Sequence, residues 1–414
     1  MYTIKNLVKA IVNELVSIIA FLIPLDPYMI ILANHGRLYL DSNNYYFLRY
    51  LKKRHQENKI IPYTVFMITT NRNLKGNLDP KNLRDLFIIL RSKIFLITHG
   101  NADFYWTKLG RDPRRLFITL RHGTPLKATG VPAEFREWKY RKELFQQKKP
   151  SKVKKMMFIS KKLNRNKPYR MYYIVGSELE RFLYSSVVKI PFEQCIPIGF
   201  TRNDLFFSQS PLDAPWEELV KSIIDEFDKV ILYAPTFRPH FISRPPYLPF
   251  LKDFSLNQLE QSLRKHNAIL LYRYHLNTRE IAETFDRKMD SPLIKNASFH
   301  IVPYVEYLLK YSDILITDYS GIIYDFLYLN RPIIALANDW KYYNQVRGFS
   351  FDFFKSFPGE IVKNFTDLLK TIDLYIKNPQ KDSERRKFCF RLFRDFSDAK
   401  NAHRTYLLLQ RLNK

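Results

Sequence analysis

The sequence contains few cysteines and few glycines. Two cysteines, Cys195 and Cys389, are too few for a disulfide framework or a zinc site, which favours a reducing cytosol. The 11 glycines never stand as Gly-x-Gly, and no Gly-Lys-Ser/Thr run is present. The dinucleotide-binding fingerprint and the P-loop are therefore excluded. An Asp-x-Asp pair that could hold a divalent ion is also missing, so no metal site is predicted.

Acidic residues are scarce relative to basic ones. Lys and Arg number 67 against 40 Asp and Glu, which gives a net charge of +27. Such an excess favours an anionic partner, which could be nucleic acid, an anionic membrane face or phosphorylated substrates. Hydrophobic residues make up 46% and aromatic residues 15% of the chain, enough for a large core and against disorder. The length of 414 residues suits two domains.

The N-terminal residues 1–24 are apolar but interrupted by Lys5, Lys9, Asn13 and Glu14. They contain no small-residue cleavage site, which makes them a poor signal peptide, and too short an apolar run for a membrane span. Two interpretations remain. The segment is either an amphipathic helix in the membrane interface or a helix packed on the first domain.

Basic residues gather in the segment 131–162, and Trp138, Tyr140 and Phe145 are interleaved with them. This run is either a solvated face or a basic surface for polyphosphate or lipid head groups. Together with residues 1–24, it predicts a peripheral protein at the cytoplasmic face of the membrane, on an anionic surface.

Short apolar runs alternate with helical patterns along the chain. We expect strands at 29–33, 64–69, 94–98, 115–120, 171–175, 196–198, 229–234, 268–275, 299–302, 314–316 and 333–336, and helices at 43–53, 80–92, 178–184, 256–266, 305–311 and 322–329. Asp79 and Ser177 are the expected N-caps of two of these helices. Such alternation predicts an α/β protein with doubly wound, mainly parallel sheets, whose ligands gather beyond the carboxyl ends of the strands.

The polar stretch 208–215 is the candidate linker. It divides the chain into an N-terminal helix at 1–24, an N-terminal domain at 25–207 and a C-terminal domain at 216–414.

The stretch 314–336 predicts a strand, a tight turn, a helix and a second strand. Ser320 and Gly321 form the turn, so unpaired N–H groups at the start of the helix would attract a phosphate. The alternative is an ordinary βαβ unit in which Ser320 only caps the helix.

Several motifs occur in an order that resembles the CDP-glycerol glycerophosphotransferase family, the enzymes that build teichoic acids and some related capsules. The matching segments are Gly36-Arg-Leu-Tyr-Leu-Asp-Ser-Asn-Asn-Tyr-Tyr46, Arg121-His-Gly-Thr-Pro-Leu-Lys127, Gly199-Phe-Thr-Arg-Asn-Asp204, Tyr233-Ala-Pro-Thr-Phe-Arg238, Thr317-Asp-Tyr-Ser-Gly-Ile-Ile-Tyr-Asp-Phe326, Arg347-Gly-Phe-Ser-Phe-Asp352 and Pro358-Gly-Glu-Ile-Val362.

The resemblance implies a GT-B fold, in which two Rossmann-like domains face a cleft. The acceptor would bind the N-terminal domain and the nucleotide the C-terminal domain, whose last helix is a candidate for packing back on the N-terminal domain. An acceptor hydroxyl would attack the phosphorus that carries the glycerol, and CMP would leave. The implied donor is CDP-glycerol or CDP-ribitol, the implied acceptor is lipid-linked or an oligosaccharide, and no cofactor is required.

Two histidines are the candidate catalytic residues. His122 ends a strand and is the predicted base, because an alcohol needs a positioned base and the pKa of histidine suits that role. His275 ends another strand, and in its protonated form it would bind the diphosphate or protonate the leaving group. The alternative for each is a structural histidine. Gly123 and Thr124, which follow His122, are predicted to bind substrate.

Fixed cations and dipoles are expected to neutralise the phosphates. The remaining candidate binding residues are Thr236, Arg238, Arg273, Asp318, Ser320, Gly321 and Asp325. Arg238 has the alternative of stabilising a turn, and Asp318 that of orienting a cationic partner. Asp325 either faces the ligand or forms an ion pair on a solvated helix.

Arg202 and Asp204 are predicted to shape the domain interface, whereas no role follows for Lys341, Arg347 or Asp352. A GT-B glycosyltransferase that uses a nucleotide sugar is the close rival. A nucleic-acid-binding protein is the rival of another class, and it is disfavoured because no recognition motif accompanies the charge.

Overall fold

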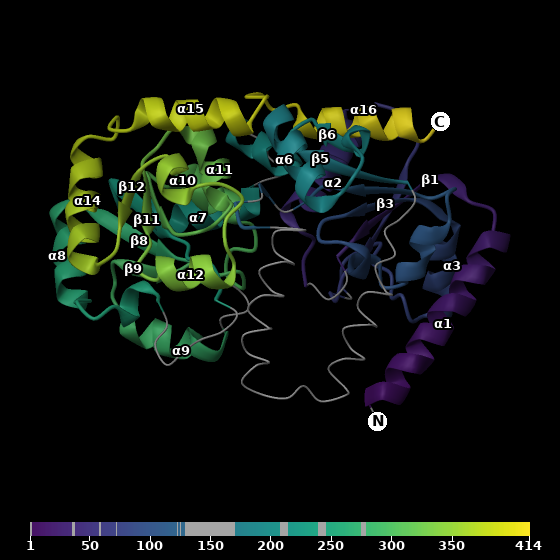
Figure 1. The fold of residues 1–414 in the computed structure, drawn as a ribbon, viewed down its shortest axis with the longest axis horizontal. Coiled ribbons are helices and arrows are strands. Elements are labelled where there is room, and N and C mark those ends of the chain that lie inside the picture. The colour runs from purple at the N-terminus through teal and green to yellow at the C-terminus, as the bar shows by residue number, and fades with distance from the viewer. Residues whose placement is uncertain are drawn as a thin grey trace.

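Two parallel sheets form the framework of the protein and lie side by side in its long direction (Figure 1). The structure, a computed structural model, describes residues 2–34, 38–57, 59–71, 73–121, 123–124, 126–128, 170–207, 214–238, 246–274 and 279–414. We call the part up to Phe207 the first half and Ala214–Phe393 the second half. The predicted α/β architecture with two mainly parallel sheets is confirmed.

The first sheet has six strands in the order β2-β1-β3-β4-β5-β6. They are β1 (Asp26–Ala33), β2 (Thr64–Ile68), β3 (Ser92–Ile97), β4 (Leu116–Thr119), β5 (Met171–Val175) and β6 (Cys195–Pro197). The central strands β3 and β4 are almost wholly buried, because helices cover both faces. This burial explains why they read as continuous apolar runs and not as alternating ones.

The helices of the first half are α1 (Tyr2–Leu22), α2 (Ser42–Gln56), α3 (Leu83–Arg91) and α6 (Glu178–Val188). Ser177 accepts a hydrogen bond from the Glu180 amide and caps α6, as predicted. The prediction of Asp79 as a cap is wrong. Asn82 caps α3 instead, because its side-chain oxygen accepts from the amides of Arg84 and Asp85, and Asp79 lies one turn earlier.

The second sheet also has six strands, in the order β12-β11-β10-β7-β8-β9. They are β7 (Lys229–Tyr233), β8 (Ala268–Tyr272), β9 (Ile294–Asn296), β10 (Ile314–Thr317), β11 (Ile333–Leu336) and β12 (Glu360–Val362). The register pairs Leu315 with Leu232 on one side and with Ile333 on the other. The stretch that predicted a strand, turn, helix and strand therefore lies in the middle of this sheet.

The strand expected at residues 299–302 is a turn. The amides of Ile301 and Val302 both donate to the carbonyl oxygen of Ser298, which closes the chain on itself and leaves no ladder. The edge strand β9 lies just before, at Ile294–Asn296, where Ile294 fills the core. The apolar side chains misled the prediction, because a short apolar run does not distinguish a strand from a turn against the core.

Helices surround the second sheet. They are α7 (Ala214–Ile224), α8 (Leu256–Lys265), α9 (Arg279–Lys288), α10 (Val305–Tyr311), α11 (Ile322–Phe326), α12 (Trp340–Val346), α13 (Phe353–Ser356), α14 (Phe365–Lys377) and α15 (Ser383–Phe393). Helix α7 begins within the stretch 208–215 that we expected to be a linker.

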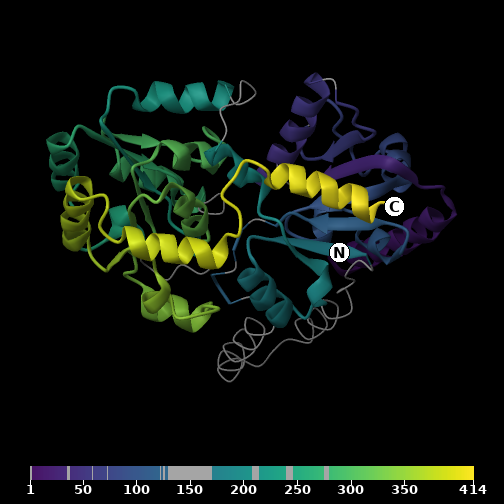
Figure 2. The same ribbon diagram turned by 90° about the horizontal axis from the view of Figure 1, so that it is seen from above.

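The C-terminal helix α16 (Asn401–Leu412) returns to the first half, as both ribbon views show (Figures 1 and 2). Ala402, Tyr406 and Leu409 join the core of the first sheet. At the end of the helix, Lys93 donates to the carbonyl oxygen of Asn413 at 2.9 Å. The first half is therefore completed by the last residues of the chain.

Helix α1 packs on the first half with a mixed face, on which Val16 and Ala20 join the core beside polar residues. Asn13 and Ser17 are buried, and both form hydrogen bonds with the backbone of Lys108. Glu14 forms ion pairs with Lys108 and Arg111. The opposite face of the helix is apolar and exposed, and it carries Ile11, Leu15, Ile18, Ile19 and Leu22. Within the described residues, no helix has the length and apolar character that a membrane crossing requires.

Candidate active site

The candidate site residues follow the carboxyl ends of strands in both sheets. Gly123 and Thr124 come after β4, and the others come after β7, β8 and β10, which are neighbours in the second sheet. The two predicted catalytic residues, His122 and His275, lie outside the described residues, as does the basic segment 131–162.

The turn after β4 has an unusual backbone. Arg121 has a φ of 55° and Gly123 a φ of 141°, both in the region that L residues rarely adopt. Asn43 on α2 holds this turn, since its side-chain amide donates to the carbonyl oxygens of Leu120 at 3.0 Å and Arg121 at 2.7 Å. A local strain fixed by a buried side chain is typical of functional sites.

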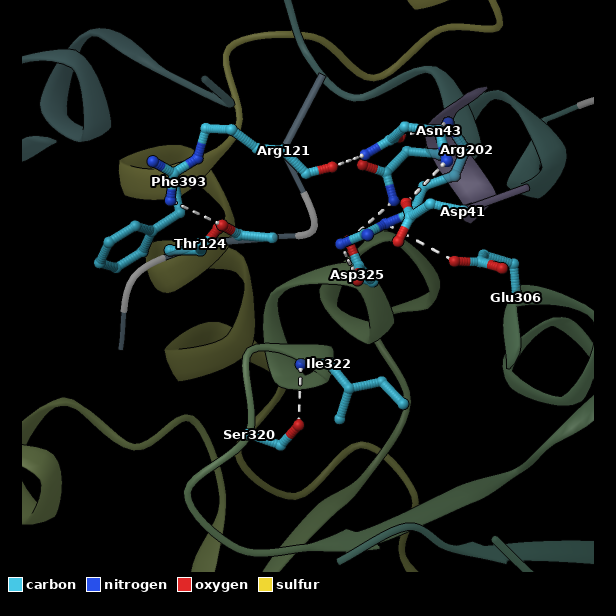
Figure 3. A network of polar contacts seen from close by, with 12 residues as sticks. Asp41, Asn43, Arg121, Thr124, Arg202, Glu306, Ser320, Ile322, Asp325 and Phe393 are labelled. Atoms are coloured by element: carbon cyan, nitrogen blue, oxygen red, sulfur yellow. Dashed lines mark hydrogen bonds and ion pairs between the residues drawn. The ribbon is translucent and has the colours of Figure 1, made fainter. Parts of the chain in front are cut away.

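The turn after β10 meets the turn after β4 across the two halves. A Cβ atom placed on Gly321 would lie 3.0 Å from the carbonyl oxygen of Thr124. Glycine at this position therefore permits a close approach of two backbones. The Ser320 hydroxyl accepts from the amide of Ile322 at 3.4 Å, the capping contact that the sequence left open (Figure 3).

Thr236 and Asp318 link the ends of β7 and β10. The amide of Thr236 donates to both carboxylate oxygens of Asp318, at 2.9 and 3.1 Å. The hydroxyl of Thr236 is buried and has no hydrogen-bond partner among the described residues. An unsatisfied buried hydroxyl costs stability, so it indicates a group that a ligand would satisfy.

Arg238 is committed to protein partners. It forms ion pairs with Asp318 at 2.9 Å and Asp339 at 2.7 Å, and it donates to the carbonyl oxygen of Thr236. Burial opposes its charge, but the two carboxylates raise the pKa of Arg238 well above its ordinary value. These contacts agree with the alternative in which Arg238 stabilises a turn. They also agree with the alternative in which Asp318 orients a cationic partner, which is Arg238 here.

Arg273 points to a loop of its own half. Its guanidinium donates to the carbonyl oxygens of Ala297, Val302 and Pro303, and so fixes the loop that leads into α10. Burial lowers the pKa of Arg273 to about 10, with Glu306 opposing the shift. The side chain thus positions backbone, and the described contacts do not bring it to Thr236 or Ser320.

Asp325 lies in a buried ion-pair cluster between the halves (Figure 3). It accepts hydrogen bonds from Arg202 at 2.7 Å and Asn203 at 2.9 Å, and Arg394 lies 3.5 Å away. Asp325 is 2% exposed, so the alternative of an ion pair on a solvated helix is wrong. We call the cluster the polar junction; its members are Glu180, Arg202, Asn203, Glu306, Asp325 and Arg394.

Two glutamates complete the polar junction. Burial raises the pKa of Glu306 to about 7, against the opposing charge of Arg202, whose guanidinium lies 3.6 Å away. Burial also raises the pKa of Glu180, which faces Arg394 at 3.9 Å. Arg394 in turn donates to the Thr124 hydroxyl at 2.9 Å. The polar junction therefore ties the turn after β4 to α11.

Arg202 lies at the contact between the halves, as predicted, since it pairs with Asp325 and Glu306. The side-chain hydrogen bonds of Asp204 are instead with α16, which completes the first half. Asp204 caps α16, because its carboxylate accepts from the amides of Asn401 and Ala402, both at 2.9 Å. Burial raises the pKa of Asp204 to about 7.

Lys127 was not among the predicted site residues. It forms an antiparallel bridge with Phe349 of the second half. Burial lowers the pKa of Lys127 to about 8; the charge of Asp318 opposes this shift, and those of Arg347 and Arg238 add to it. The motif that ends at Lys127 was the available sequence signal. Glu180, Glu306 and Arg394 carried no such signal, because their partners are far away in the sequence.

Comparisons with known proteins show what the chain resembles. A profile of the family described as CDP-Glycerol:Poly(glycerophosphate) glycerophosphotransferase matches residues 15–410. A teichoic acid glycerol-phosphate transferase of Staphylococcus aureus is 29% identical over 293 residues, which are 68% of this chain and 68% of that protein. A teichoic acid poly(glycerol phosphate) polymerase of Bacillus subtilis is 28% identical over 335 residues, which are 78% of this chain but only 40% of the polymerase.

The fold is that of a solved relative. A structure of the wall teichoic acid polymerase TagF has a TM-score of 0.70 at 19% identity, covering 99% of this chain and 96% of that one. A UDP-GlcNAc 2-epimerase from Neisseria meningitidis has a TM-score of 0.52 at 12% identity, covering 92% and 100%. At these identities the likeness concerns the fold alone.

The relatives confirm the assignment made from the motifs, a glycerophosphotransferase-like enzyme of teichoic acid biosynthesis. Since the profile spans almost the whole chain, the protein belongs to the CDP-glycerol:poly(glycerophosphate) glycerophosphotransferase family.

Proposed function

We propose that the protein transfers glycerol phosphate from CDP-glycerol to a hydroxyl group of a lipid-linked or polymeric acceptor. The acceptor oxygen forms a bond to the phosphorus that carries the glycerol, the bond from that phosphorus to the CMP oxygen breaks, and the proton of the hydroxyl passes to a base. CDP-ribitol is the second donor to consider, since a teichoic acid ribitol-phosphate polymerase of Staphylococcus aureus is 32% identical over 209 residues.

The contact between two turns carries this proposal. Thr124 follows the predicted base His122 by two residues and meets Gly321, which is next to Ser320. Only 3.0 Å separate the Thr124 carbonyl oxygen from the position of a Cβ on Gly321. The two motifs come from different sheets and are about two hundred residues apart. A reaction that joins an acceptor to a nucleotide-bound phosphate needs this meeting, because both reactants must be held in one geometry.

The halves would divide the work as in a GT-B enzyme. In this proposal the first half holds the acceptor at the turn after β4, and the second half holds the nucleotide at the ends of β7, β8 and β10. The hydroxyl of Thr236 is buried without a hydrogen-bond partner among the described residues, which is an argument for binding a phosphate or sugar oxygen next to it. Ser320 and Gly321 would contact the diphosphate, whereas Arg238, Asp318 and Asp325 act by positioning, because protein groups occupy them.

His122 is the base in this mechanism, and His275 supports the leaving CMP. A positioned base contributes roughly 10²–10⁴-fold to such a reaction. We expect His122→Asn and His275→Asn each to lower kcat by about that factor. A matched control is His55→Asn, which changes an exposed histidine near the end of α2 and should leave kcat unchanged.

The test is the release of CMP. Purified protein is incubated with labelled CDP-glycerol and with either a lipid-linked or an oligomeric acceptor, and CMP and the extended acceptor are measured together. CDP-ribitol replaces the donor in a parallel reaction. Thermal shifts with UDP-sugars examine the rival glycosyltransferase, because a bound ligand raises stability. A protein that releases no CMP from either CDP-polyol, or that is stabilised only by a UDP-sugar, would contradict the proposal.

We also propose that the protein works at an anionic membrane surface. Helix α1 packs on the first half with one face and leaves a second, apolar face exposed, where Leu15 is 54%, Ile18 62% and Leu22 81% exposed. An exposed apolar face of this kind, on a chain with a net charge of +27, suits the interface of an anionic bilayer.

Vesicle binding tests the membrane proposal. The double variant Ile18→Ser, Leu22→Ser should weaken binding to phosphatidylglycerol vesicles by at least about tenfold, because each change removes apolar area that the bilayer would bury. Leu407→Ser is the control, since Leu407 is 49% exposed on α16 and not on α1. Unchanged binding of the double variant, or of a chain without residues 1–24, would refute this part.

A further inference from the structure

A short segment of the first half crosses to the second half. Lys127 is bridged to Phe349, the amide of Ser350 donates to the carbonyl oxygen of Leu126 at 3.0 Å, and the amide of Ala128 donates to Gly348 at 3.1 Å. The Ser350 hydroxyl also donates to the carbonyl oxygen of Lys127 at 3.0 Å. The backbone at Lys127 is thus held by the second half, although it continues the turn after β4.

The Lys127 side chain lies among charges of the second half. Asp318 stabilises its ammonium group, and Arg347 and Arg238 destabilise it. Asp318 and Asp339 are the carboxylates of this group, and both are already paired with Arg238. The five side chains together carry one net positive charge, in a place that burial makes poorly hydrated.

The same place contains an unsatisfied polar group. Asp318 accepts from the amide of Thr236, whose own hydroxyl is buried without a partner among the described residues. A net positive charge and a free buried hydroxyl together fit an anion with several acceptor oxygens, such as a phosphate group. Packing explains neither the net positive charge nor the unsatisfied hydroxyl, because an apolar side chain would fill the same space without the free-energy cost of burying a polar group.

We propose that Lys127 is a residue of the donor site, which brings a cation from the acceptor half to the diphosphate of the CDP-polyol. This inference rests on the proposed function and adds a residue to it. Because the lysine belongs to the first half, the diphosphate is fully neutralised only when the turn after β4 sits in place. Donor binding therefore favours the same arrangement of the halves that brings the acceptor to the phosphorus.

The protonation of Lys127 provides a specific readout. Its charge is present below a pH of about 8 and is lost above it, so the affinity for CDP-glycerol should fall as pH rises through 8 and 9. Three neighbours of Asp318 have shifts that keep them out of this window. Burial opposes the charge of Arg238, but the carboxylates of Asp318 and Asp339 raise its pKa well above the ordinary value. Burial raises the pKa of both Tyr319 and Tyr343 above the usual tyrosine range.

Three variants and calorimetric titration with CDP-glycerol, without acceptor, test the proposal between pH 6.5 and 9.5. Lys127→Met should weaken binding about 10–100-fold at pH 7 and remove its pH dependence. Lys127→Arg should keep binding and make it independent of pH, because an arginine stays protonated. Lys370→Met, which changes an exposed lysine of α14, should match the natural protein at every pH. With acceptor present, Lys127→Met should lower kcat about 10²-fold.

The outcomes separate the two proposals. If the natural protein releases CMP while Lys127→Met binds and turns over CDP-glycerol equally well at every pH, the role of Lys127 is refuted and the proposed function stands. If the natural protein neither binds nor uses a CDP-polyol, both are refuted. If Lys127→Met fails to fold, the pH profile of Lys127→Arg decides. If Lys127 binds the donor, this variant loses the fall in affinity above pH 8. If Lys127 is only structural, the fall comes from another group and the variant keeps it.

Discussion

The polar junction and the contact of α1 with the first half are both built from ion pairs, but the pairs differ in how far they are exposed to solvent. In the polar junction, the paired side chains of Arg202 and Asp325 are 6% and 3% exposed. In the α1 contact, Lys108 is 13% and Glu14 44% exposed. A buried pair that loses one partner leaves an uncompensated charge, whereas an exposed pair contributes little. The first contact should therefore set the geometry of the molecule, and the second should only orient a helix.

Removing the shared carboxylate of the polar junction should have the largest effect. Asp325→Asn leaves Arg202 and Arg394 buried with less compensating charge, so we expect the free energy of unfolding to fall by about 3–5 kcal/mol. Urea denaturation measures this. Glu384→Gln removes an exposed partner of Lys387 and should leave stability unchanged. A loss below about 1 kcal/mol for Asp325→Asn would mean that the junction is not a buried charge network.

The pH dependence of stability should also single out the polar junction. Glu306 keeps its proton in the folded protein up to a pH of about 7, whereas a glutamate in the unfolded chain releases it near about 4.3. Between these values the folded state binds more protons, so its stability falls as pH rises, by at most about 1.4 kcal/mol per pH unit. Glu306→Gln should remove that slope.

Urea denaturation of both proteins at several pH values between 5 and 8 gives the comparison. The difference between the two curves isolates Glu306 from the other titrating groups. If the curves run parallel over this range, Glu306 is ionised throughout and the interpretation is wrong.

The close approach at Gly321 should give an intermediate effect. Gly321→Ala places a methyl group 3.0 Å from the Thr124 carbonyl oxygen, a contact so tight that this oxygen must give by a few tenths of an ångström. Overpacking of this kind costs typically 1–3 kcal/mol. Ser320→Ala, on the same turn, loses only a weak capping contact and serves as the stability control. A stable Gly321→Ala protein with natural kcat would show that the two turns need not meet for the reaction.

The α1 contact should give the smallest effect. Glu14→Gln loses the ion pairs with Lys108 and Arg111, and we expect a loss of about 0–1 kcal/mol. This difference should vanish between about 0.1 and 1 M salt, where the Debye length falls from about 10 to 3 Å. The loss caused by Asp325→Asn should persist at high salt. Equal salt sensitivity of the two variants would remove the distinction between the contacts.

The framework of the fold was predictable because parallel strands buried on both faces are continuous apolar runs. The runs at β1, β5, β10 and β11 needed no tertiary information, and neither did the cap at Ser177. The strand expected at residues 299–302 failed because apolar side chains also fill turns.

The partners of the candidate site residues were not predictable. Motif spacing places Asp325 on a helix after a strand end, but Arg202 lies 123 residues away and no local pattern connects the two. Arg238 and Arg273 were expected at the substrate because cations follow the strands, whereas the fold uses both to hold backbone and carboxylates. Amphipathicity predicts that α1 has two faces, but which face turns inward depends on distant partners: Lys108 and Arg111 for Glu14, and the core of the first sheet for Val16 and Ala20.

The return of α16 to the first half means that the chain passes between the two sheets twice, once after Phe207 and once after Phe393. Arg394 lies at the second passage and donates a hydrogen bond to the Thr124 hydroxyl of the first half. Separating the two sheets would therefore break this bond at the same place where the chain crosses, so the second passage also holds the turn after β4.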